Sequence, residues 1–262
     1  MKDLRIGLIQ TQQFWEDKTA NLNHFESHFL NHIDANSVDL VLLPEMFNTS
    51  FSMNVASIAE QMDGASLVWL KTWAKKLNCQ MGGSIIISEN GQYYNRFVIV
   101  SKNGIEAAYD KRHLFRMANE DQHFAAGQNR VIHQMKGWSI LLQVCYDLRF
   151  PVFSRNRLVD NEKEYEAVVY VANWPKKRAF IWKNLLQARA IENQAYSVGL
   201  NRVGEDGNGI EYSGDSMVVD PWGNILTTFP THEQKFQIIT LEKSVLNDIK
   251  TSFPAYLDAD TL

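Results

Sequence analysis

Three reactive side chains each stand at the end of an apolar, β-favouring run of the sequence. These are a carboxylate at Glu45, an ammonium at Lys111 and a thiol at Cys145. The ends of strands that run in the same direction meet at one edge of a sheet, where α/β folds place their chemistry. We therefore expect the three side chains to converge on one sheet edge.

The three side chains have complementary chemistry. A cysteine attacks as its thiolate, and a free thiol near neutral pH is mostly protonated, so Cys145 needs a neighbouring cation or base. Lys111 can supply the positive charge, and Glu45 can accept the proton, pass it to a departing amine and later activate water. Lys111 and the backbone N–H of Tyr146 can hold the oxyanion. Together these groups predict a cysteine-dependent hydrolase of amides or nitriles.

Each of these residue types also has a plainer interpretation. A free cysteine at a strand end is most often a small buried side chain, which is our interpretation of Cys79. The glutamate could cap a loop, and the lysine could be a solvated edge charge. A Cys–His pair is the competing catalytic arrangement, and the long irregular segment 113–130 offers His113 and His123 for it.

The length and the charge content of the chain are those of an ordinary globular protein. The chain has 262 residues, which we interpret as one domain spanning 1–262, with 26 basic and 30 acidic side chains and a net charge of −4. This mild acidity argues against a nucleic-acid partner, because proteins normally bind nucleic acids through a basic patch.

The cysteine content and the apolar runs suggest where the protein works. Two cysteines make a disulfide framework implausible and favour a reducing, cytoplasmic compartment. The N-terminal segment passes directly into a strand-like run and lacks the features of a secretory signal. No apolar stretch approaches the length of a membrane span, so we expect no membrane partner.

Hydrophobic periodicity predicts alternating strands and helices. Turns at 89–92 and 102–104 predict hairpins, so part of the sheet structure is antiparallel. Two mixed sheets covered by helices, an α/β architecture, fit this order. The column of His24, His28 and His32 on the first helix is interpreted as a solvated face and not as a metal site. Strands are expected at 4–10, 39–45, 81–87, 94–101, 105–110, 140–145, 167–172, 196–201, 215–220, 225–229 and 236–241, and helices at 18–33, 67–78, 153–159 and 180–194.

Three segments of the sequence resemble the signatures of the nitrilase, or carbon–nitrogen hydrolase, superfamily, in the family's order. They are Leu42-Leu43-Pro44-Glu45, the run 109–115 from Tyr109 to Phe115, and the run 145–151 from Cys145 to Pro151. The resemblance implies an αββα sandwich of two mixed β-sheets flanked by helices, paired as an αββααββα homodimer. It also implies a Glu45, Lys111 and Cys145 triad that needs no metal or organic cofactor.

The same resemblance suggests a fourth catalytic residue. Family members often carry a second glutamate in the loop after the lysine, which orients that lysine and takes part in catalysis. Glu120 is the matching residue, and a solvated loop carboxylate is its plainer interpretation.

Four further segments of the sequence resemble the bacterial omega-amidase branch of the superfamily. They lie at 150–156, 173–175, 189–196 and 201–204. Those enzymes release ammonia from the terminal amide of short 2-oxo acids such as 2-oxoglutaramate and 2-oxosuccinamate. Arg149 is the candidate anchor for the remote carboxylate, with a structural pairing to Asp147 or to a buried loop carbonyl as the alternative. Trp174 either walls the pocket or fills core.

Other functions remain open from the sequence. A deaminated glutathione amidase, an N-carbamoyl amide hydrolase and a nitrilase are the rivals within the superfamily. A non-catalytic binding module is the rival from another class, although all three triad residues are present. The basic run 176–178 would add positive potential near an anionic substrate, but we interpret it as a solvated turn.

Overall fold

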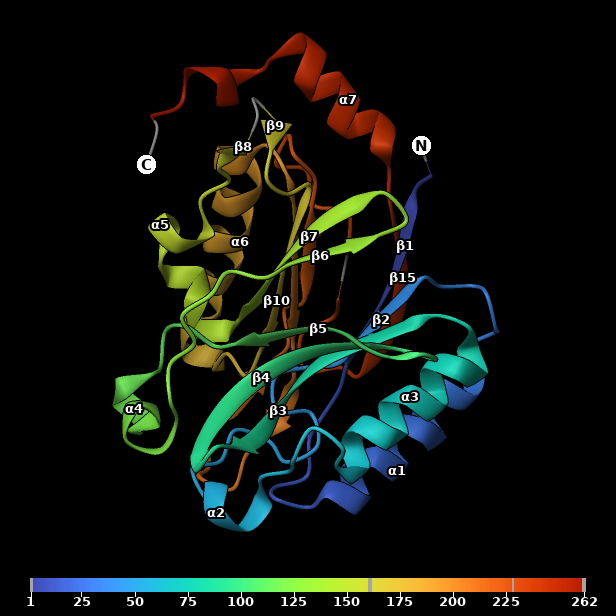
Figure 1. The fold of residues 1–262 in the computed structure, drawn as a ribbon, viewed down its shortest axis with the longest axis vertical. Helices are drawn as coiled ribbons and strands as arrows, with labels where there is room; N and C mark the ends of the chain where they lie inside the picture. Colours follow the sequence, from blue (N-terminus) through green and yellow to red (C-terminus); the bar gives the residue numbers. More distant parts are fainter. Residues whose placement is uncertain (1, 160–161, 228, 261–262) are drawn as a thin grey trace.

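Two β-sheets packed face to face form the centre of the protein (Figure 1). The computed structural model describes residues 2–159, 162–227 and 229–260. The six-stranded sheet has the order β15 (Lys235–Leu241), β1 (Leu4–Gln10), β2 (Leu40–Leu42), β3 (Gln80–Glu89), β4 (Gln92–Ser101) and β5 (Gly104–Asp110). The five-stranded sheet has the order β14 (Met217–Val219), β11 (Tyr196–Asn201), β10 (Ala167–Ala172), β7 (Trp138–Val144) and β6 (Ile132–Met135).

Helices cover the outer face of each sheet. In Figure 1, α1 (Lys18–His28) and α3 (Ala65–Leu77) lie over the six-stranded sheet, and α6 (Ala179–Asn193) lies over the other. The layers therefore follow the order α, β, β, α, and the predicted α/β sandwich is confirmed. The shorter elements are α2 (Val55–Ile58), α4 (Glu120–His123), α5 (Pro151–Ser154), α7 (Lys243–Ser252), and the two small ribbons β8 (Leu158–Val159) with β9 (Glu162–Lys163) and β12 (Val203–Glu205) with β13 (Glu211–Ser213).

Strand β2 shows why these residues form a sandwich. It is buried throughout, because its two faces pack into different parts of the core. Leu42 belongs to the cluster between the sheets, with Phe97 and Leu142. Val41 belongs to the cluster under the helices, with Phe25 and Trp73.

The strand directions bring certain ends together. Strands β1, β2 and β3 run parallel, whereas β3, β4 and β5 are joined by antiparallel pairing, as the two predicted hairpins require. Strands β2 and β5 therefore run the same way. In the other sheet β7, β10 and β11 are parallel.

Two predicted elements are wrong. The helix expected at 153–159 is only the single turn α5, which Pro151 begins. Asn156 then holds the chain in a loop, because its N–H donates to Asn193 Oδ1 at 2.8 Å. The strand expected at 225–229 is reduced to an isolated bridge between Ile225 and Val219, and residue 228 lies outside the described residues.

The first helix is shorter than expected, and one face of it was misinterpreted. It ends at His28, and a separate 3-10 turn covers Leu30–His32. His24 is not solvated: it is buried, and its Nε2 lies 2.8 Å from Thr11 Oγ1 and from Gln234 Oε1. Burial lowers the pKa of His24 despite the hydrogen bond with Gln234.

None of the helices in the described part of the chain is long and apolar enough to cross a bilayer.

Candidate active site

The three predicted residues meet between the two sheets and not on one sheet edge. Glu45 follows β2 and Lys111 follows β5, so both leave the six-stranded sheet at the same edge. Cys145 follows β7, which belongs to the five-stranded sheet. The expected single edge is therefore wrong, because the two sheets pack face to face and so bring the end of β7 next to the ends of β2 and β5.

Lys111 lies at the centre of a buried charge cluster. Its Nζ lies 2.9 Å from Glu45 Oε1 and 2.9 Å from both carboxylate oxygens of Glu120. The side chains of Lys111, Glu45 and Glu120 are at most 1% exposed. Asn95 Nδ2 donates to Glu45 Oε1 at 2.8 Å and to Glu120 Oε1 at 3.3 Å. The structure thus brings the second glutamate to the lysine.

Glu120 is not a solvated loop carboxylate. It is the first residue of α4, and its Oε2 accepts the N–H of Phe115 at 2.6 Å. The expected long loop therefore contains a helical turn that points this carboxylate inward.

The charges in the cluster set one another's protonation. Burial disfavours the ammonium form of Lys111, but Glu120 and Glu45 outweigh burial and raise the pKa of Lys111 above its ordinary value. Burial, with a contribution from Glu45, raises the pKa of Glu120, although Lys111 opposes the change. Lys111 therefore stays charged, and its ammonium group donates to oxygens of both carboxylates.

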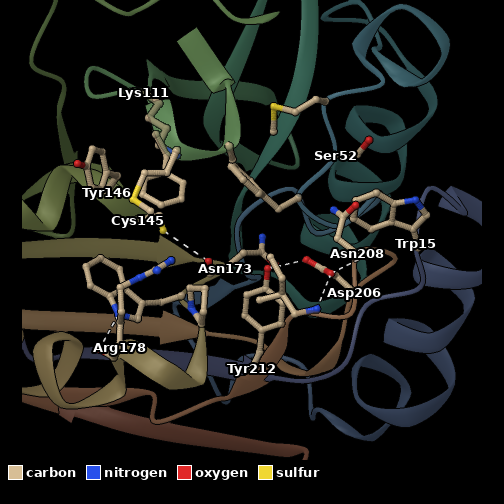
Figure 2. A pocket seen from close by; sticks show the side chains of 18 of the residues that line it. Trp15, Ser52, Lys111, Cys145, Tyr146, Asn173, Arg178, Asp206, Asn208 and Tyr212 are labelled. Carbon is tan, nitrogen blue, oxygen red and sulfur yellow. Dashed lines mark hydrogen bonds between the residues drawn. The ribbon is translucent and has the colours of Figure 1, made fainter. Parts of the chain in front are cut away.

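Cys145 lies near Lys111 of this cluster (Figure 2), in a turn with a strained backbone. Its φ of +44° lies in the left-handed region, which non-glycine residues rarely adopt. Its Sγ lies 3.8 Å from the backbone oxygen of Asn173. Burial and Glu45 raise the pKa of Cys145 well above its ordinary value, and Lys111 opposes them. The thiol is therefore neutral at rest, with a base and a cation beside it.

Asp147 holds the strained turn in place. Its buried carboxylate accepts the N–H of Val144 at 3.0 Å and the hydroxyl of Tyr109 at 2.7 Å. It also accepts the N–H of His113 at 3.0 Å. These contacts join the turn after β7 to the turn that follows β5. Asp147 thus joins the turn that carries Cys145 to the turn that carries Lys111.

The two histidines considered for a Cys–His pair lie elsewhere. His113 Nδ1 is 2.7 Å from Asp147 Oδ1, and its ring stacks on Phe150 with centroids 3.9 Å apart. His123 is exposed on α4. The structure therefore favours Glu45 and Lys111, and not a histidine, as the partners of Cys145.

Asn173 is a site residue that the sequence interpretation used only as a family feature. Its backbone N–H donates to Glu45 Oε2 at 2.8 Å, and its Nδ2 donates to the Glu45 backbone oxygen at 2.6 Å. Together with its contact to Cys145, this places Asn173 against both Cys145 and Glu45. The sequence signal for it was its position directly after the buried strand β10.

A cavity of about 510 Å³ opens onto Cys145 and Lys111. Tyr146 lines it beside Cys145, as do Arg149 and Trp174. The Arg149 guanidinium lies over the Trp174 ring, 5.1 Å from its centroid. The alternative pairing of Arg149 with Asp147 is not what the structure contains, because Asp147 is engaged with backbone N–H groups, Tyr109 and His113.

The cavity also corrects the interpretation of the basic run 176–178. Lys176 is a solvated side chain that pairs with Glu211 at 2.8 Å. Arg178, in contrast, lines the cavity (Figure 2). Its backbone oxygen accepts the Trp174 Nε1–H at 2.9 Å, which fixes the indole in the cavity wall.

In residues 2–159, 162–227 and 229–260, no group of three or more His, Cys, Asp or Glu side chains is arranged to hold a metal ion.

Known proteins resemble the chain over nearly its whole length. The carbon-nitrogen hydrolase family matches residues 5–250. The omega-amidase YafV of Escherichia coli strain K12 is 44% identical over 260 residues, which cover 99% of this chain and 98% of that protein. The 2-oxoglutaramate amidase of Bacillus subtilis strain 168 is 30% identical over 257 residues, covering 97% and 96%.

A solved structure is similarly close. A CN-hydrolase superfamily protein from Xanthomonas campestris, determined with an arsenic adduct in its active site, superposes with a TM-score of 0.96. It is 40% identical and the match covers 100% of this chain and 99% of that one. The predicted family is therefore confirmed: the chain belongs to the carbon–nitrogen hydrolase family.

Proposed function

We propose that this carbon–nitrogen hydrolase is an omega-amidase, which converts the terminal amide of short 2-oxo dicarboxylic acid monoamides into a carboxylate and ammonia. The substrates we have in mind are 2-oxoglutaramate and 2-oxosuccinamate. The observation that carries the proposal is the ion-pair network of Lys111 with Glu45 and Glu120 beside Cys145, at a cavity that Lys111, Cys145 and two arginines line. The similarity to an omega-amidase and to a 2-oxoglutaramate amidase supports the same substrate class.

The first half of the reaction forms a thioester. Cys145 Sγ adds to the amide carbon while Glu45 takes the thiol proton. The oxyanion binds the ammonium group of Lys111 together with the backbone N–H of Tyr146. Glu45 then gives its proton to the amide nitrogen, the C–N bond breaks and ammonia leaves.

The second half releases the acid. Glu45 removes a proton from water, and the hydroxide adds to the thioester carbon. The C–S bond breaks, Cys145 recovers a proton and the new carboxylate leaves. Glu120 orients Lys111 through both cycles, and we infer that it shares in the catalysis by keeping this ammonium charged and in place.

Two residues of the cavity are proposed to bind the substrate. Arg149 holds the remote carboxylate, because a guanidinium fixed on the face of Trp174 keeps its in-plane N–H groups free to donate. Trp174 walls the cavity next to the reacting carbon. Its indole N–H is already bonded to Arg178, so its ring supplies an apolar surface.

A substrate panel tests this proposal. Purified protein is given 2-oxoglutaramate, 2-oxosuccinamate, deaminated glutathione, an N-carbamoyl amino acid and a nitrile, and both ammonia and CO2 are measured. We expect the highest kcat/KM for a 2-oxo acid monoamide, with ammonia as the only gas released. A higher kcat/KM for the carbamoyl compound, with equal ammonia and CO2, would assign the protein to another branch.

We further propose that residues 1–262 act as one domain that pairs into a cytoplasmic homodimer of the αββααββα type. The outer helical layer supports the pairing, since Phe180 and Ile191 on α6 are 76% and 52% exposed and Val152 on α5 is 70% exposed. Both cysteines are free, which fits a reducing compartment.

Light scattering of the purified protein tests the pairing. We expect a dimer that Phe180→Glu weakens, whereas Val68→Glu on the opposite helical layer leaves it intact. A monomeric wild type would refute the pairing without affecting the proposed activity.

A further inference from the structure

A second arginine shares the cavity with Arg149. Of the three described residues 176–178, Arg178 is the one that lines the cavity. Lys176 pairs with Glu211, and Lys177 is exposed. The chain therefore places one cation of this basic run where it can meet a bound substrate.

Arg178 is seated on an aromatic ring, as Arg149 is. Its guanidinium carbon lies 5.3 Å from the Phe115 ring centroid, and that of Arg149 lies 5.1 Å from the Trp174 centroid. Stacking on a ring orients a guanidinium without using its in-plane N–H donors. Both residues are half-buried, so each has lost part of its hydration while keeping its donors available.

Among the described residues, neither cation has an anionic partner. The contacts between described residues give each guanidinium an aromatic ring and no carboxylate. Arg130 shows the contrast, because its Nη2 lies 2.6 Å from Glu164 Oε2. Two planar donor groups without a carboxylate, in the wall of a reaction cavity, indicate a ligand with several oxygen acceptors.

The proposed substrate has one carboxylate, and Arg149 alone can bind that group. A second guanidinium then requires a second acceptor near it. In a 2-oxo acid, the ketone oxygen sits on the carbon next to the carboxylate, so the two acceptors are adjacent. A saturated acid monoamide offers only the carboxylate.

We propose that Arg178 donates to the 2-oxo oxygen of the substrate and so makes the enzyme select 2-oxo acid monoamides over their saturated counterparts. This inference rests on the proposed function, with Arg149 holding the carboxylate. Arg178 is then a specificity-determining residue, and its contact with Phe115 keeps it aimed at the substrate.

A purely structural role for Arg178 makes a different prediction. Phe115 belongs to the segment that holds Glu120, and it packs edge-on against Tyr146 with centroids 5.0 Å apart. If Arg178 only supported Phe115 in the cavity wall, its loss would weaken the binding of every substrate alike. The discriminating quantity is therefore the ratio between a 2-oxo ligand and its saturated analogue.

Binding to a Cys145→Ala background measures this ratio without turnover. The ligands are 2-oxosuccinamate and succinamate, which differ only at carbon 2, and calorimetry gives both affinities. Adding Arg178→Gln should reduce the preference for the 2-oxo ligand by about 10- to 100-fold, the usual worth of a hydrogen bond to a charged group. Adding Lys177→Gln, which removes a neighbouring exposed charge, should retain the preference. Arg149→Gln should weaken both ligands.

The outcomes separate this inference from the proposed function. Equal weakening of both ligands by Arg178→Gln would overturn the inference and leave omega-amidase activity standing. Loss of the preference in Arg149→Gln instead of Arg178→Gln would overturn it too, as would failure of the background protein to bind either ligand. Wild-type protein that binds 2-oxosuccinamate selectively but releases no ammonia from it would refute the proposed function alone. Arg178→Lys, which keeps the charge but not the planar fork, should show an intermediate preference.

Discussion

The surroundings of the two cysteines differ far more than their burial does. Cys79 and Cys145 are 8% and 9% exposed, and each borders a cavity. Burial raises the pKa of both thiols, that of Cys79 to about 12. By exposure and pKa alone, the two would be judged equally inert.

Their partners distinguish them. The charge that acts on Cys79 is that of Asp39, which raises its pKa further. Cys145 has Lys111 and Glu45 beside it, which we propose stabilise its thiolate and take its proton, and it lines the cavity from a turn with positive φ. We therefore expect a base and a cation at the thiol, and not the burial of the thiol, to decide its reactivity.

Replacing each cysteine in turn gives the largest expected difference. Cys145→Ala should lower kcat/KM for 2-oxo monoamides by at least about 10⁴-fold, because no other group can form the thioester. Cys79→Ala should change it less than about threefold and cost about 1 kcal/mol of folding free energy. Ammonia release and chemical denaturation measure the two effects. Comparable losses of activity in both variants would contradict the comparison.

Replacing Glu45, the proposed base, makes the surroundings of Cys145 more like those of Cys79. Glu45→Gln keeps the shape of the side chain but cannot accept a proton, so kcat/KM should fall by about 10²- to 10⁴-fold. Lys111 keeps its bidentate partner Glu120 in this variant, which protects the fold. Glu120→Gln is the matched control, for which we expect a smaller loss. An equal or larger loss of kcat/KM in Glu120→Gln would assign the role of the base to Glu120.

Alkylation compares the two thiols in one molecule. Near neutral pH, iodoacetamide should modify Cys145 at least about tenfold faster than Cys79, since a base and a cation favour its thiolate during attack. Peptide mass spectrometry over time gives both rates. The advantage should shrink in Glu45→Gln. Equal rates in the wild type would remove the distinction on which the mechanism rests.

The smallest effect concerns stability at alkaline pH. The folded-state pKa of Cys79 is raised, so its neutral form stabilises the fold below the ordinary thiol pKa, and this contribution is lost as pH rises toward about 12. Between about pH 8 and about pH 10.5, wild type should lose about 1–2 kcal/mol more unfolding free energy than Cys79→Ala. Cys145 is present in both proteins and cancels. If the unfolding free energies of the two proteins changed in parallel with pH, the Cys79 thiol would not be responsible for the loss of stability.

The sequence predicted well the strands that end at the candidate catalytic residues, because the signals for those strands are local. Glu45, Lys111 and Cys145 each follow a short apolar strand, and such strands can be recognised from neighbouring residues alone. Which sheet each strand joins is a tertiary property. The single-edge arrangement was therefore wrong for Cys145, although the strand that delivers it was correct.

The missed features all depend on contacts distant in sequence. Asn173 acquires its role from Glu45, which lies 128 residues away. His24 was assigned to a solvated face because the helix periodicity cannot reveal Gln234. Arg178 looked like part of a solvated basic turn until the fold placed it in the cavity wall.

Mapping the acyl-enzyme tests the central claim most directly. Wild type is mixed with excess 2-oxosuccinamate, quenched in acid during turnover and digested, and the acylated peptide is identified by mass. The account predicts an acyl group on the sulfur of Cys145, absent from the Cys145→Ala protein and absent from Cys79. Turnover accompanied by an acyl group on any other side chain would contradict it.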